Sequence, residues 1–141
     1  MAFFDKLFGT KKSFAALEPD NPIFEYIEEI KQPLESLAKE TKDRLEVVPA
    51  DKAAYVFIGK PPKMFGLAWV QDGKVYNLKT VAKDRKLSPA KIQQVSENLR
   101  EAYKRSQDDT RYSAPLGDQE LVIASSDKLN QEVTRIMEKI T

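Results

Sequence analysis

The sequence predicts an α+β fold, with a mainly antiparallel sheet of four or five strands and helices packed mostly on one face of it. The dipeptide Asp72-Gly73 lies between two apolar runs, which is the pattern of a two-residue β-hairpin. The pairs Asn21-Pro22 and Ser88-Pro89 each place a capping residue before a proline, which is typical of a helix start. Together with the other apolar runs, these patterns predict the element order α-β-β-β-α-β-β-α.

The composition limits the chemistry that the chain can perform. Hydrophobic residues make up 41% and charged residues 32% of 141 residues, which is typical of one globular domain. The chain has no histidine and no cysteine, and so lacks the imidazole acid-base group, the thiolate nucleophile and the usual zinc, copper and iron ligands. The net charge of +1 produces no strong field for nucleic acid. We therefore expect no metal, no cofactor, no catalytic residues and no nucleic-acid partner.

The chain divides into an amphipathic N-terminal segment, residues 1–12, and a single α+β domain, residues 13–141. The longest apolar runs have seven residues, whereas a membrane-spanning helix needs about 20. The N-terminus has no basic leader followed by a long apolar stretch, so it does not resemble a signal peptide. These observations predict a cytoplasmic location.

The first predicted helix begins at Asn21-Pro22. Apolar residues then recur at steps of three and four, which places them on one helical face. Pro33 interrupts this pattern without shifting its phase, so we expect either a kinked helix over residues 22–45 or two short helices that share a buried face. The apolar positions are Ile23, Ile27, Ile30, Leu34, Leu37 and Leu45.

Three strands are predicted next. Residues 53–58 are apolar on both alternating faces, as in a central strand that is covered on each side. Residues 64–71 and 74–81 flank the hairpin turn, whose two-residue loop places Trp69 opposite Tyr76 and Leu67 opposite Leu78. The face of the hairpin that carries Trp69 is bulky and must be covered. The lighter face is expected to be partly open to water or to a partner, and it carries Gly66, Ala68, Asn77 and Lys79.

The remaining elements complete the predicted order. Ser88-Pro89 opens a helix whose apolar residues extend to Tyr103, residues 120–124 form a strand, and residues 125–127 cap a final helix. A further short strand over residues 110–113 is a weaker prediction. By topology alone, this order is similar to that of class I type III secretion chaperones. No sequence motif accompanies this likeness.

The N-terminal segment is the first candidate site. Its large apolar residues recur at helical spacing and two lysines follow them, a pattern that favours reversible docking on an anionic membrane or on a partner protein. The first nine residues resemble the amphipathic starts of bacterial proteins that visit the inner membrane, such as the signal recognition particle receptor. Packing of these side chains on the domain itself is the alternative. The candidate contact residues are Phe3, Phe4, Leu7, Phe8, Lys11 and Lys12.

A second candidate site is a set of basic residues expected near one edge of the sheet. They could bind a small anion, although a solvated charged loop is the plainer interpretation because no glycine-rich cradle accompanies them. The acidic pairs Glu28-Glu29 and Asp108-Asp109 are adjacent in sequence and are not expected to converge on a metal or a substrate. The candidate anion-binding residues are Lys60, Lys63, Lys83, Arg85 and Lys86.

These observations predict a non-enzymatic protein-interaction or adaptor module, chaperone-like in role. It would be cytoplasmic, docking peripherally to the inner membrane or to a partner through its N-terminal segment. One alternative is a small anion- or ligand-binding domain that uses the basic sheet edge. Another is an enzyme that works through carboxylates or lysine. Homodimerisation through the lighter sheet face or through an edge strand is a further expectation.

Overall fold

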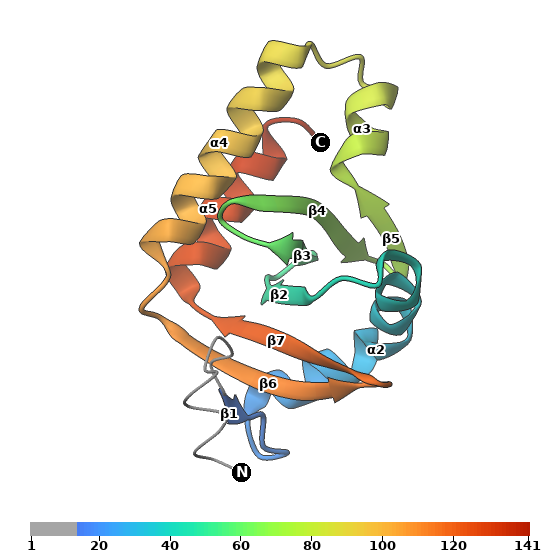
Figure 1. Ribbon diagram of the computed structural model, residues 1–141, viewed down its shortest axis with the longest axis vertical. Coiled ribbons are helices and arrows are strands. Elements are labelled where there is room, and N and C mark those ends of the chain that lie inside the picture. The colour runs from blue at the N-terminus through green and yellow to red at the C-terminus, as the bar shows by residue number, and fades with distance from the viewer. Residues whose placement is uncertain (1–13) are drawn as a thin grey trace.

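The computed structural model describes residues 14–141, which form a seven-stranded mixed sheet with helices on both faces (Figure 1). The strands lie in the order β1-β6-β7-β2-β3-β4-β5. Strand β1 is parallel to β6 and β7 is parallel to β2, whereas the other neighbours are antiparallel. The elements are β1 (Ala15–Ala16), α2 (Pro22–Thr41), β2 (Leu45–Pro49), β3 (Ala54–Lys60), β4 (Met64–Gln71), β5 (Lys74–Asn77), α3 (Leu78–Asp84), α4 (Pro89–Arg105), β6 (Thr110–Leu116), β7 (Gln119–Ser125) and α5 (Asp127–Glu138).

The α+β class is confirmed, but the expected four- or five-stranded, mainly antiparallel sheet is wrong. The predicted order omitted β1, β2 and α3. Strand β2 was missed because Leu45 continues the apolar spacing of the preceding helix. The helix stops earlier, at Thr41, because Lys42 adopts a left-handed conformation with φ of 59° and its N–H donates to the carbonyl of Ala38. Residues 22–41 form one helix with Pro33 inside it.

The hydrophobic core has two layers, one on each face of the sheet. Helices α4 and α5 lie side by side over the face that carries Phe57 and Trp69. Helix α2 covers the opposite face, which carries Val56 and Ala68. The prediction that the lighter face is open is therefore wrong at Ala68, which is fully buried. Because the Ala68 side chain is small, α2 can pack closely against this face of the sheet.

The predicted hairpin is confirmed over its first half only. Trp69 pairs with Tyr76 and their rings stack with centroids 5.9 Å apart. Asp72 and Gly73 have φ of 54° and 77°, the positive values that a type I′ turn requires. The predicted extension of the strand to Val81, with Leu67 opposite Leu78, is wrong.

The second strand of the hairpin ends early because a helix cap replaces it. The side-chain oxygen of Asn77 accepts a hydrogen bond from the Thr80 N–H at 2.8 Å. This cap starts α3 at Leu78, so the chain leaves the sheet after Asn77. Strand β5 consequently pairs with β4 only from Ala68 to Gln71.

The remaining sequence-based elements agree with the structure. Strand β6 includes residues 110–113 and pairs antiparallel with β7, which confirms the weaker strand prediction. Ser88 caps α4 by accepting a hydrogen bond from the Lys91 N–H at 3.1 Å. Ser126 caps α5 by accepting one from the Leu129 N–H, also at 3.1 Å.

A buried ion pair ties β2 to β6 across the intervening strand β7. The Arg111 Nε donates to Oε2 of Glu46 at 3.0 Å, and the Tyr103 hydroxyl donates to Oε1 at 2.7 Å. The guanidinium also donates to the carbonyl and the hydroxyl oxygen of Ser106. Within residues 14–141, every buried side-chain nitrogen and oxygen has a hydrogen-bond partner. The cluster is enclosed and satisfied, so it holds the fold together and offers nothing to a ligand.

The buried tyrosines are expected to make the fold sensitive to alkaline pH. Burial raises the pKa of Tyr26, although the Ala50 N–H donates to its hydroxyl oxygen at 3.3 Å and acts to lower the pKa. Burial also raises the pKa of Tyr55 and of Tyr103. The folded state then holds these protons more tightly than the unfolded chain, in which the pKa is about 10. The free energy of unfolding should be unaffected by these groups below about pH 10 and should fall above it.

Urea unfolding between pH 9 and pH 11.5 checks this expectation. The variant Tyr26→Phe should show a shallower decline with pH. At pH 7 it should lose about 1 kcal/mol, since the hydrogen bond to Ala50 is gone. An identical decline in both proteins would show that Tyr26 is not the group responsible.

Candidate functional site

The two sets of candidate residues from the sequence have different outcomes. The N-terminal set, Phe3, Phe4, Leu7, Phe8, Lys11 and Lys12, lies outside the described residues, and its docking role stays a prediction. The basic set lies within them.

The basic residues fall into two groups that approach the same strand. Lys60 ends β3 and Lys63 lies in the connection to β4, whereas Lys83 belongs to α3. Arg85 and Lys86 follow α3, and the Arg85 Nη2 donates to the backbone oxygen of Thr141 at 3.0 Å. Lys83 and Gly66 of β4 line one groove, so α3 and the start of β4 are neighbours.

This groove lies where the sheet lacks a partner strand. After β5 ends, α3 leads away from the sheet edge and into α4 (Figure 1). The ladder between β4 and β5 does not include β4 residues 64–67, so the outer edge of this stretch pairs with no strand of the described chain. We call the resulting hollow, of about 400 Å³, the α3 groove. It is lined by Gly66, Leu78, Lys79, Ala82, Lys83, Leu87 and Ile92.

The lining combines apolar walls with a basic rim. Ala82 is buried, and Leu78, Leu87 and Ile92 are partly buried. The exposed residues Lys79 and Lys83 lie four positions apart on α3, and therefore on one side of that helix. No acidic residue is among the residues that line the groove.

The sequence around the groove has a strong charge bias. Residues 60–91 contain eight basic and two acidic residues, a net charge of +6. The whole chain carries +1, so the remainder carries −5. The net charge of the whole chain is therefore close to zero although its charges are unevenly distributed along the sequence. Arg100, on α4, fixes the connection between β3 and β4, because its Nε donates to the carbonyl of Pro62 at 2.7 Å.

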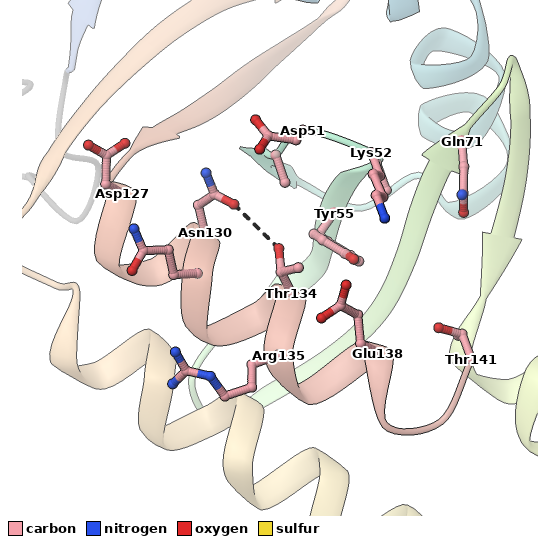
Figure 2. Close-up of a pocket in the computed structure, with 13 residues that line it drawn as sticks. Asp51, Lys52, Tyr55, Gln71, Asp127, Asn130, Thr134, Arg135, Glu138 and Thr141 are labelled. Carbon is pink, nitrogen blue, oxygen red and sulfur yellow. Dashed lines mark hydrogen bonds between the residues drawn. The ribbon is translucent and has the colours of Figure 1, made fainter.

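A larger hollow, the polar cleft, lies between the turn that joins β2 to β3 and helix α5 (Figure 2). Its volume is about 920 Å³. Figure 2 shows Lys52 and Glu138 approaching it from different elements, with Tyr55 between them. Its lining residues are Ala50, Asp51, Lys52, Ala53, Tyr55, Gln71, Asp127, Asn130, Gln131, Thr134, Arg135, Glu138 and Thr141.

One side chain of the polar cleft, Tyr55, has a displaced pKa. Burial raises the pKa of Tyr55, a hydrogen bond with Thr134 lowers it, and the negative charge of Glu138 raises it. The net shift is away from neutrality, which does not suit a general acid or base at physiological pH. The Thr134 hydroxyl donates to Oδ1 of Asn130 at 3.4 Å, within α5.

Two kinds of feature are absent from the described residues. Residues 14–141 contain no group of three or more acidic side chains placed to hold a metal ion. Among the same residues, no helix combines the length and the apolar character needed to cross a bilayer.

The apolar part of the α3 groove was missed by sequence reasoning. Leu78 was assigned to a strand, and its neighbours were therefore placed on the wrong element. The sequence did contain an indication, because Asn77 can cap a helix as readily as it can end a hairpin strand.

The chain was compared with known proteins at three levels. It matches no protein-family model, no curated protein and no solved structure.

Proposed function

We propose that this protein is a non-enzymatic interaction module that holds a segment of a partner protein in the α3 groove. One observation carries the proposal: an apolar groove opens beside β4 residues 64–67, whose outer edge has no ladder partner. An exposed strand edge beside side-chain pockets is a recurrent way of binding peptides, because the backbone supplies hydrogen bonds and the pockets supply selectivity.

The groove favours a peptide over the small anion of the alternative hypothesis. Both ligands would use Lys79 and Lys83. An anion gains nothing from the apolar side chains of Leu78, Leu87 and Ile92, which make up much of the lining.

Gly66 lines the groove, so a bulky side chain there should interfere with a segment bound along this edge of β4 without harming the fold. A Cβ added there would meet no heavy atom within 4 Å, and its φ lies outside the left-handed region. Leucine also suits a strand better than glycine. We expect Gly66→Leu to abolish partner binding while leaving the free energy of unfolding unchanged or higher.

Site-specific photo-crosslinking in cells tests this expectation. A photoreactive amino acid in place of Lys79, at the groove rim, should give a discrete adduct with a partner protein. The same amino acid in place of Lys128, which is exposed on α5, is the matched control. The adduct at position 79 should disappear in Gly66→Leu. Equal adducts at both positions, or an adduct that survives Gly66→Leu, would refute the proposal.

A further inference from the structure

We infer that the occupant of the α3 groove is an extended acidic segment with apolar residues at alternate positions, added beside β4 as a short strand. This inference rests on the proposed function and specifies the chemistry of the partner.

The first argument is charge complementarity. Residues 60–91 carry a net charge of +6, and the rim of the groove is formed by Lys79 and Lys83. The lining contains no acidic side chain to neutralise them, and neither lysine forms an ion pair within the described residues. A partner segment with carboxylates would meet complementary charge along this rim, whereas a basic segment would be repelled.

The second argument is spacing. Lys79 and Lys83 are four residues apart on α3, which corresponds to about 6 Å along the helix axis. In an extended chain, side chains on one face repeat every second residue, about 6.6 Å apart. Leu78 and Ala82 have the same separation on the groove wall. An extended segment can therefore set alternate apolar side chains against Leu78 and Ala82 while its intervening carboxylates meet the long lysines of the rim.

The third argument is the length of the open edge. The seven residues of α3 extend over about 10 Å, which is the length of three extended residues. The unpaired stretch of β4, residues 64–67, is of similar length at about 13 Å. One short strand therefore matches the length of this open edge, which continues the line of β5.

A membrane surface suits the groove less well than a peptide does. Membrane docking requires apolar side chains that protrude into the lipid. In the groove, Ala82 is 5% exposed and Leu78 is only partly exposed. These side chains form a recessed wall, which a narrow chain can enter and a bilayer cannot.

The test uses the ¹⁵N-labelled full-length chain titrated with a synthetic peptide. The probe has the core Glu-Val-Glu-Leu-Glu-Val, flanked by Gly-Ser, and the matched probe has lysine in place of each glutamate. We expect the acidic peptide to shift the amide resonances of residues 64–67 and of α3. The basic peptide should bind at least tenfold more weakly, and affinity for the acidic peptide should fall with added salt.

Two variants connect the binding to the groove. Lys79→Glu combined with Lys83→Glu should weaken binding of the acidic peptide at least tenfold. Lys128→Glu, a charge reversal on α5, should leave it unchanged. Circular dichroism of both variants establishes that they are folded.

The remaining outcomes overturn the inference. Equal binding of the two peptides, amide shifts confined to the polar cleft, or no binding of the acidic peptide would each refute it. Shifts at the groove caused by vesicles of phosphatidylglycerol, without any effect of the peptide, would assign the site to a membrane instead. If the crosslink at position 79 still depends on Gly66 while the acidic peptide fails, the proposed function stands and only the partner chemistry is wrong.

Discussion

Replacing Arg111 by methionine is expected to lower the free energy of unfolding by about 3–5 kcal/mol, since it leaves a buried carboxylate without its counter-charge. The side chains of Arg111 and Glu46 are only 4% and 5% exposed, so water cannot take the place of the missing guanidinium. The substitution also removes hydrogen bonds to Ser106. Urea unfolding at pH 7, followed by the fluorescence of the single tryptophan, Trp69, measures the change.

A double variant separates the buried charge from the lost packing. Glu46→Gln combined with Arg111→Met removes the negative charge while the amide can still accept a hydrogen bond from the Tyr103 hydroxyl. Its free energy of unfolding should exceed that of Arg111→Met alone, although Glu46→Gln removes one more native group. If the double variant is the less stable of the two, the uncompensated charge is not the main cost.

The second large effect is expected at Phe57, which is fully buried in the core layer beneath α4. Its ring lies 5.3 Å from that of Phe65 and 5.2 Å from that of Tyr103, measured between centroids. Phe57→Ala leaves a cavity among these rings and should cost about 3–5 kcal/mol. Urea unfolding with the Trp69 signal measures this loss.

Two further substitutions serve as controls for the cavity. Phe57→Leu keeps most of the buried volume and should cost clearly less than the alanine variant. Met64→Ala removes a side chain that is 79% exposed and should change the free energy of unfolding by no more than about 0.5 kcal/mol. Equal losses in Phe57→Ala and Met64→Ala would contradict the placement of Phe57 in the core.

The candidate site was only partly predictable from the sequence. Lys83 and the other basic residues were singled out by their charge, and their approach to one sheet edge was expected from the hairpin. The apolar wall formed by Leu78 and Ala82 was not expected, because the apolar pattern at the start of this segment also fits a continued strand. Which of the two conformations wins depends on the cap that Asn77 supplies, together with packing on β4 and α4.

The sequence by itself determined the elements whose causes are local. Capping residues before proline set the starts of α2 and α4, and Asp72-Gly73 set the hairpin turn through its positive φ angles. Such features depend on a few neighbouring residues, so they can be derived without knowledge of the rest of the chain.

Only the tertiary structure decided how the elements meet. It placed β7 between β6 and β2, set α2 over the lighter sheet face at Ala68, and left the edge of β4 open beside α3. The pairing of Arg111 with Glu46 likewise joins residues that are distant in sequence. These outcomes follow from long-range pairing and burial, which local patterns do not encode because alternating and continuous apolar runs can pack in more than one arrangement.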